Sequence, residues 1–242
     1  IMISRITLEN FFSFRTSTTI TLNPGINILL GINGSGKSNF LKAIRLLYES
    51  IVGNGLEKIF LKEWSGFHSV ANFNNDKNDY IKLSFEFDSN AINKITQQEG
   101  YHFHGNLIYD ISIVQFGATS YYLKEKLYSP NRNTDKNDFI YMEMDKAQGR
   151  ISTMEKGKIG FQSYPQEGRQ ISFKQTEPVL RQISDPERFY PLFTLRRALE
   201  ELSAYYCYDT TYSRPVRQPA AYSTEKQLMS DGQNLAIILN NI

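Results

Sequence analysis

Eight consecutive residues carry the clearest chemical signal in this chain: Gly31, Ile32, Asn33, Gly34, Ser35, Gly36, Lys37 and Ser38. They complete the pattern G-x-x-x-x-G-K-[ST], in which the backbone N–H groups of a glycine-rich loop surround phosphate oxygens. The glycines allow positive φ angles and lack the Cβ atoms that would hold a phosphate away. The motif therefore predicts a phosphate-binding loop (P-loop) for a nucleoside triphosphate.

Two side chains of the motif have separate chemical roles. Lys37 is the predicted catalytic cation, because its flexible ammonium group can reach the β and γ phosphates. The hydroxyl of Ser38 is the predicted ligand of Mg²⁺. ATP and Mg²⁺ are thus the expected cofactors. The alternative is a turn that only caps a helix, which would require neither the Lys-Ser pair nor three glycines.

The segments on either side of the motif suit this role. Residues 26–30 (INILL) have the composition of a short buried strand, and residues 38–48 have apolar residues at helical spacing. Two further strands are predicted before the motif, at residues 3–12 and 17–22. A strand buried on both faces belongs inside a parallel sheet. Without its neighbours, two or three aliphatic side chains worth about 1.5–3 kcal/mol each would be exposed.

After residue 55 the pattern changes. Residues 56–78 are irregular and polar, and short strands are predicted at 80–88, 107–116, 121–128, 139–145, 150–154 and 169–174. Helices are predicted at 177–184, at 189–206, and within 224–242 around Leu235, Ile238 and Leu239. We expect an α/β fold, in which a P-loop lobe with a mixed sheet and a P-loop helix is joined to an antiparallel β-rich region and C-terminal helices. The expected segments are 1–55, 56–176 and 177–242.

Composition sets only broad limits. The chain has 242 residues, and 27 Lys and Arg against 25 Asp and Glu give a net charge of +2, which neither requires nor excludes a nucleic-acid partner. The single cysteine, Cys207, cannot form an internal disulfide. The sequence has no basic and apolar leader and no long apolar run, so we expect a cytoplasmic protein without a membrane partner.

Three stretches carry a family resemblance. Residues 2–14 (MISRITLENFFSF), 22–27 (LNPGIN) and 31–39 (GINGSGKSN) resemble the start of an ABC-type ATPase head of the SMC/RecF kind. Residues 109–113, 125–127 and 230–236 resemble AAA-family predicted ATPases related to the OLD (overcoming lysogenization defect) group. The resemblance implies that residues from Asn33 to Asn39 contact phosphate. It also implies that two heads enclose ATP between them in a homodimer or a higher homo-oligomer.

In such heads a glutamine that follows a central strand binds Mg²⁺ together with the P-loop serine. Gln115 is the candidate here, and an ordinary polar residue at a strand end is the alternative. Many SMC-like heads have a phosphate-binding Arg or Lys where this chain has Phe12. Arg15 could replace it if the turn directs that side chain inward, and otherwise Arg15 is a surface residue.

Other parts expected of a complete head are missing from the sequence. No run of four apolar residues ends in Asp-Glu, the pair that would bind Mg²⁺ and polarise the attacking water. Residues 205–209 (YYCYD) are the nearest imitation and are better interpreted as a helix end. We therefore expect the N-terminal part of a longer ATPase, inactive in hydrolysis when alone.

Two smaller patterns allow more than one interpretation. Residues 229–233 (MSDGQ) resemble the ABC signature loop, or else a segment that begins a helix, which the following residues Asn234, Leu235 and Ala236 favour. His102 and His104 would share a strand face and could form a metal pair. Without a third ligand nearby, a structural role is favoured for them.

Three functions compete. The leading hypothesis is a Mg²⁺-dependent ATPase head that dimerises with ATP and acts in DNA repair or in defence against phage and plasmids, with DNA and a nuclease or other effector as possible partners. The alternative is a nucleotide-gated assembly module that controls a partner effector with little hydrolysis. A small-molecule or tRNA kinase is disfavoured by the start of the chain (NFFSF).

Overall fold

The computed structural model describes residues 2–72, 79–97, 100–117, 120–131, 137–165, 172–202 and 234–240. The chain divides into two compact units, Ile1–Glu201 and Leu202–Ile242. The first unit continues across the boundaries expected at residues 55 and 176. The described part of the second unit contains the helix α6 (Leu235–Asn240), close to the helix expected around Leu235, Ile238 and Leu239.

The first unit is built on one eight-stranded sheet with the strand order β2-β1-β3-β4-β5-β6-β7-β8. Every neighbouring pair is antiparallel, so the mixed sheet expected from the sequence is not present among the described strands. The strands are β1 (Ile3–Glu9), β2 (Thr18–Thr21), β3 (Tyr80–Phe87), β4 (Leu107–Phe116), β5 (Ser120–Ser129), β6 (Phe139–Asp145), β7 (Gln148–Glu155) and β8 (Lys158–Tyr164).

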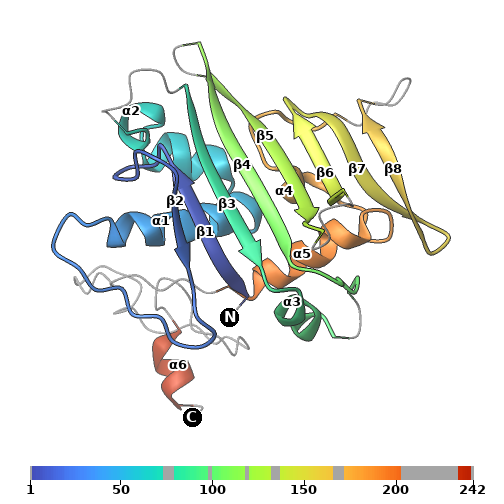
Figure 1. Ribbon diagram of the computed structural model, residues 1–242, viewed down its shortest axis with the longest axis horizontal. Helices are drawn as coiled ribbons and strands as arrows, with labels where there is room; N and C mark the ends of the chain where they lie inside the picture. The colour runs from blue at the N-terminus through green and yellow to red at the C-terminus, as the bar shows by residue number, and fades with distance from the viewer. Residues whose placement is uncertain are drawn as a thin grey trace. The chain divides into compact units, whose positions relative to one another are not determined.

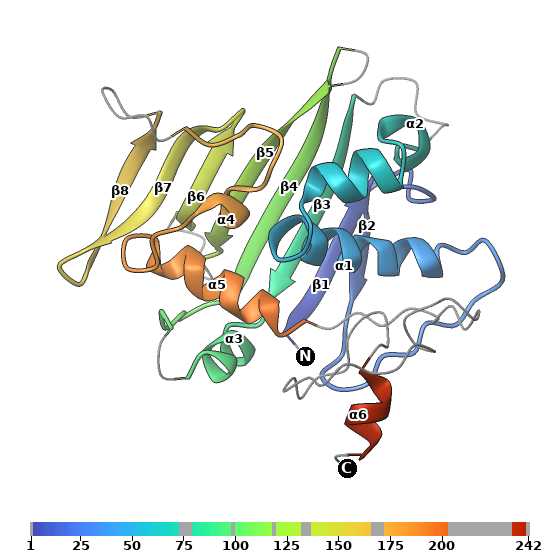
Figure 2. The same cartoon turned by 180° about the vertical axis from the view of Figure 1, so that it is seen from behind.

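Helices cover one face of this sheet. Figure 2 shows α1 (Lys37–Ile51), α4 (Val179–Gln182) and α5 (Tyr190–Glu200) in front of the strands, and Figure 1 shows the opposite face without helices over it. The π-helix η1 (Glu57–Glu63), α2 (Phe67–Val70) and α3 (Ser89–Ile95) complete the helical elements of the first unit.

The sequence explains why the sheet has one covered face. Along β3, Ile81, Leu83, Phe85 and Phe87 alternate with more polar residues and are fully buried. The helices match this face with apolar stripes, which comprise Phe40, Ala43, Leu46, Leu47 and Ile51 of α1 and Leu192, Leu195, Ala198 and Leu199 of α5. Burial of each such side chain contributes about 1.5–3 kcal/mol, so the core fixes α1 against the sheet.

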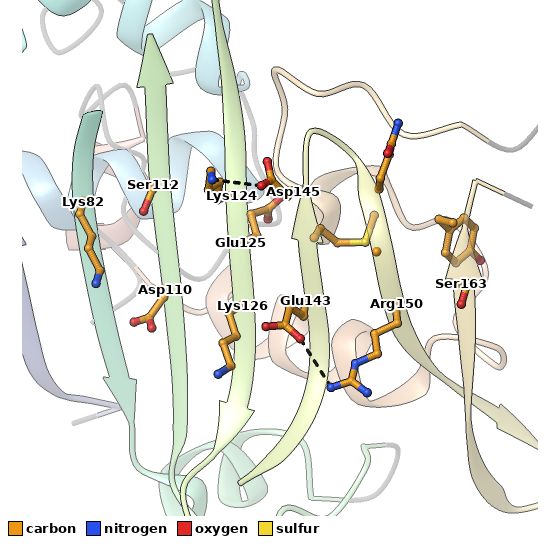
Figure 3. A pocket seen from close by; sticks show the side chains of 14 residues that line it. Lys82, Asp110, Ser112, Lys124, Glu125, Lys126, Glu143, Asp145, Arg150 and Ser163 are labelled. Carbon is orange, nitrogen blue, oxygen red and sulfur yellow. Dashed lines mark ion pairs between the residues drawn. The ribbon is translucent and has the colours of Figure 1, made fainter. Parts of the chain in front are cut away.

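The opposite face carries charges of alternating sign. In register across β4 to β7 lie Asp110, Lys126, Glu143 and Arg150, and Figure 3 shows their side chains on this face. Arg150 pairs with Glu143 at 3.5 Å, and on the same face Lys124 pairs with Asp145 at 3.0 Å. Opposite charges on neighbouring strands stabilise a solvated sheet face.

Several predicted elements differ from the structure. Strand β8 and helix α3 were not predicted, and the segment expected to be irregular contains η1 and α2. Of the strand predicted at 169–174, residues 172–174 are not strand and the rest lies outside the described residues. The helix predicted at 189–206 is α5, which ends at Glu200. Residues 205–209 and 229–233 also lie outside the described residues.

The strand expected at residues 26–30 is not formed. Asn27 instead makes a local turn, because its side chain accepts a hydrogen bond from the Asn23 N–H at 2.8 Å and donates one to the Asn23 carbonyl at 2.9 Å. Ile26 is 90% exposed, Ile28 76% and Leu30 88%. A strand needs a hydrogen-bonding neighbour, and no described strand pairs with this segment. The exposure expected for these side chains without neighbours is confirmed.

A tight turn follows β1 and leads towards β2. Asn10 and Phe12 both have positive φ, at 52° and 49°. The buried Asn10 side chain donates to the Tyr80 carbonyl at 2.5 Å and accepts from the Asn72 N–H at 2.8 Å. Asparagine tolerates this backbone conformation better than most residues, and its amide links three segments. We refer to residues 10–15 as the first hairpin.

Replacing Asn10 tests this link. Asn10→Ala is expected to lower the free energy of unfolding by about 2–4 kcal/mol, because two partly buried backbone groups lose their partners and alanine is strained at positive φ. Urea denaturation of both proteins measures the difference. Thr19→Ala is the control, since the Thr19 side chain makes an exposed hydrogen bond with Thr7 and its loss should cost little. An equally small loss for Asn10→Ala would show that the amide does not hold the hairpin.

Candidate nucleotide-binding site

The P-loop leads directly into α1, which begins at Lys37. Gly36 is the N-cap residue with φ 93°, and Gly34 has φ 87°. Both angles lie in the left-handed region, where glycine is favoured. No side chain caps the helix, so the N–H groups of its first turn are available to an anion, which the helix dipole also attracts.

Lys37 lies over the loop that precedes it. Its Nζ donates to the carbonyl of Gly31 at 2.6 Å and to that of Ile32 at 2.8 Å, with Ser35 Oγ 3.4 Å away. The ammonium group is therefore held at the loop by acceptors that phosphate oxygens could replace. The neighbouring Ser38 is exposed, as a hydroxyl that binds a metal ion and its water must be. The loop and helix start predicted from the motif are thus brought together.

The first hairpin forms a wall beside the P-loop. Asn39 Nδ2 donates to Ser13 Oγ at 3.0 Å. A Cβ atom placed on Gly36 would lie 2.9 Å from Ser13 Oγ and 3.2 Å from the ring of Phe14. Ser13 and Phe14 were not predicted as site residues. The signal was their place in the motif NFFSF, whose contact with the P-loop only the fold establishes.

Phe12 packs beside α1 at Lys42, about one turn beyond the start of the helix. The Nζ of Lys42 is 3.9 Å from the centroid of the Phe12 ring, and the Trp64 ring packs edge-on against Phe12 at 5.4 Å. Partial burial lowers the pKa of Lys42 from its ordinary value. Lys42 of α1 thus contacts Phe12, the position at which SMC-like heads are expected to have an Arg or Lys. Arg15 is exposed, and its role stays a prediction.

Gln115 is not placed beside the P-loop. It lies near the carboxyl end of β4, where its backbone N–H donates to the Asp79 carbonyl at 2.6 Å. Figures 1 and 2 both show this end of β4 apart from the start of α1. The strands β3, β1 and β2 follow β4 in the sheet towards the edge at which α1 begins. The first unit therefore does not join Gln115 to Ser38, and the role of Gln115 as a Mg²⁺ ligand stays a prediction.

The two histidines lie before β4 with ring centroids 5.2 Å apart. Within the described part of the chain, no group of three or more His, Cys, Asp or Glu side chains is arranged to hold a metal ion.

A glycine-rich loop, a lysine over its carbonyls and an uncapped helix start define a P-loop NTPase site. Comparison with known proteins gives the family: residues 2–203 match the model of the AAA ATPase domain, so the chain belongs to that family. Membership of this family implies nucleotide binding.

Two relatives are SMC proteins. The chain is 34% identical over 84 residues to the structural maintenance of chromosomes protein 3 homolog of Plasmodium falciparum (isolate 3D7), a match that covers 35% of this chain and 6% of the relative. It is 45% identical over 53 residues to structural maintenance of chromosomes protein 3 of Dictyostelium discoideum, covering 21% of this chain and 4% of the relative. The chain thus spans a small part of these relatives.

The comparisons support the resemblance to SMC-like heads. The finer likeness to the OLD group stays a prediction. No helix in the described ranges is long and apolar enough to span a bilayer.

The contact between the first hairpin and the P-loop can be tested at Gly36. Gly36→Ala and Gly34→Ala both put alanine at positive φ, but only the first places its Cβ against Ser13 and Phe14. We expect unfolding free energies lowered by about 1 kcal/mol for Gly34→Ala and about 2–3 kcal/mol for Gly36→Ala, measured in urea without nucleotide. Equal losses would show that the hairpin moves aside freely.

Proposed function

We propose that this chain is the ATP-binding part of a Mg²⁺-dependent, SMC-like ATPase head. The observation that carries the proposal is the hydrogen bonding of Lys37 Nζ to the carbonyls of Gly31 and Ile32, at the uncapped start of α1. When ATP binds, Lys37 exchanges these carbonyls for β- and γ-phosphate oxygens. The N–H groups that follow Gly34 and Gly36 bind the remaining oxygens.

Ser38 provides the metal ligand in this proposal. Its exposed hydroxyl lies in the first turn of α1, at the end of the helix that would meet the phosphates. A Mg²⁺ ion held by Ser38 would neutralise charge on the phosphates. Lys37 and Ser38 orient the triphosphate, and they provide no general base for the attacking water.

The exposed aliphatic segment supports a site completed by further polypeptide. Ile26, Ile28 and Leu30 are each at least three-quarters exposed directly before the P-loop. We propose that residues 26–30 become a strand when a parallel strand from another part of the ATPase pairs with them. The same further polypeptide would bring the carboxylates that activate water. A second head would then cover the triphosphate in a homodimer or a higher homo-oligomer.

The biological setting is a more distant inference. The names of the two relatives concern chromosome maintenance, and on that basis we propose DNA as the polymer on which ATP turnover acts. Repair, defence against phage or plasmids, and coupling to a nuclease are the processes compatible with such a head. The second candidate function is a nucleotide-gated assembly module. It is favoured because, in the part of the chain that the structure describes, no hydrogen bond or ion pair places a carboxylate at Lys37.

Removing the P-loop lysine tests the nucleotide site. Lys37→Ala is expected to weaken ATP binding by about 100-fold or more, since charge-assisted hydrogen bonds to phosphate contribute about 1.5–3 kcal/mol each. Isothermal titration calorimetry measures the affinity. Lys62→Ala is the matched control, because Lys62 is an exposed lysine of η1 whose ion pair among the described residues is with Glu57 at 3.7 Å. Unchanged affinity in Lys37→Ala would refute the P-loop assignment.

The state of assembly tests the dimer and separates the two candidate functions. Sedimentation velocity of the full-length protein should show a dimer or larger oligomer with Mg²⁺ and ATP, and a smaller species with Lys37→Ala. Phosphate release should accompany assembly and rise when DNA is added. Assembly without turnover would favour the gated module, and a monomer in every nucleotide state would exclude the ATP-enclosing dimer.

A further inference from the structure

A buried carboxylate lies in the covered face of the sheet, away from the P-loop. Glu125 of β5 is 5% exposed and is hydrogen-bonded by Tyr109 Oη at 2.7 Å. Figure 3 shows Glu125 between Lys124 and Lys126 on β5. These two lysines belong to the opposite sheet face, and among the described ion pairs none involves Glu125. A carboxylate without a cation is costly in a protein core, so its other contacts need explanation.

The second contact of Glu125 is with the start of α4. The backbone N–H of Val179 lies 3.1 Å from both carboxylate oxygens. Pro178 precedes Val179 and has no N–H of its own. Glu125 thus links β5 to the first residue of α4 through a single shared donor.

Two side chains join the α4 region to the end of the P-loop helix. Glu177 accepts from the N–H groups of Leu56 at 2.9 Å and Glu57 at 3.1 Å, where η1 begins. Arg181 donates to the Gly53 carbonyl at 2.7 Å. Both contacts fall on the turn between α1 and η1.

That turn is continuous with α1. The N–H of Gly53 donates to the Tyr48 carbonyl at 3.0 Å, and the N–H of Gly55 donates to the Glu49 carbonyl at 2.8 Å. A helix of this length is a stiff rod of about 22 Å. Hydrogen bonds and the covalent chain of residues 177–181 thus connect Glu125 to the carboxyl end of α1. Lys37 and Ser38 lie at the amino end of the same helix.

We propose that Glu125 is a positioning residue of the nucleotide site, which acts by holding α4 and through it the carboxyl end of α1. The inference rests on the proposed ATP-binding function. Release of α4 frees the turn at residues 53–57 and removes the polar contacts that hold the carboxyl end of α1. The core still holds the helix against the sheet, but small shifts of α1 and of the P-loop at its other end then cost less.

Protonation of Glu125 controls this link. Burial raises its pKa to about 7, although the hydrogen bonds from Tyr109 and Val179 act in the opposite direction. From β4 it faces Tyr109, whose pKa burial and Glu125 itself raise well above the usual value, so Tyr109 stays a neutral donor. From β6 it faces Met144, which does not titrate, and from α4 it faces the Val179 N–H. Two charged residues of the α4 segment, Glu177 and Arg181, pair with each other at 3.9 Å.

The direction of the pH effect follows from linkage. With α4 in place, Glu125 keeps its proton up to about pH 7, whereas a solvated glutamate loses it near its ordinary pKa of 4.5. The state with α4 in place is therefore most stable below pH 4.5, relative to the state with α4 released, and loses stability as the pH rises to 7. Between pH 6 and pH 8, the equilibrium constant for opening of α4 should rise about tenfold.

Hydrogen exchange and nucleotide affinity of the full-length protein at pH 6, 7 and 8 test the proposal. In the wild type, protection of residues 179–182 and 56–57 should fall about tenfold beyond the intrinsic pH effect on exchange, and ATP affinity should fall with it. Glu125→Gln keeps an acceptor for Val179 but cannot ionise, so both pH dependences should flatten. Glu125→Ala should expose both segments and weaken ATP binding at every pH.

Control variants keep the outcomes distinct. Lys126→Gln changes the neighbouring charge on the other sheet face and should behave as the wild type does. If Glu125→Ala does not fold, Glu177→Ala breaks the same link at its other end, because it removes the acceptor for the Leu56 and Glu57 N–H groups. An unchanged pH dependence in Glu125→Gln would overturn the proposal, as would release of α4 without loss of ATP affinity. Exchange is measured without nucleotide, so failure of wild-type ATP binding would refute the proposed function separately.

Discussion

The structure depends on the packing of α1 against the covered face of the antiparallel sheet. One side of the helix is core, where Phe40, Ala43, Leu47 and Ile51 are buried. Truncating a core residue of this size typically costs about 2–5 kcal/mol, so the helix cannot shift without loss of stability. Because the same helix begins with Lys37 and Ser38, the hydrophobic core also fixes the position of the phosphate site.

The surroundings of the P-loop are held by different forces. On one side the first hairpin is fixed by Asn10 and packs Ser13 and Phe14 against Gly36. On the other side, residues 26–30 present aliphatic side chains to solvent. The first hairpin thus forms a wall beside the P-loop, whereas the segment just before the P-loop presents an apolar surface that we propose pairs with a further strand. The chain that carries this P-loop belongs to the AAA ATPase domain family. Its matches to SMC proteins extend over 84 and 53 residues.

The sequence predicted elements best where periodicity was strong. The alternation of apolar residues located β3, β4 and β6 to within one residue at either end. Strand β8 was missed because its residues KIGFQSY include a glycine and few apolar positions. At residues 26–30 the error was the opposite one: a strand was predicted and is not formed. A strand-like composition cannot form a strand without hydrogen-bonding neighbours. For the site, the motif supplied Gly31 to Ser38, whereas Gln115 depended on resemblance.

The sequence by itself determined the phosphate loop, because positive φ at Gly34 and Gly36, the helix start and the adjacent lysine are properties of a few consecutive residues. Tertiary structure alone decided what surrounds that loop. Ser13 meets Asn39 across 26 positions, and Glu177 reaches Leu56 across 121. Glu125 reaches Val179 across 54. Such contacts exist only after distant segments pack together, and their energies depend on burial and geometry that no local pattern of residues encodes.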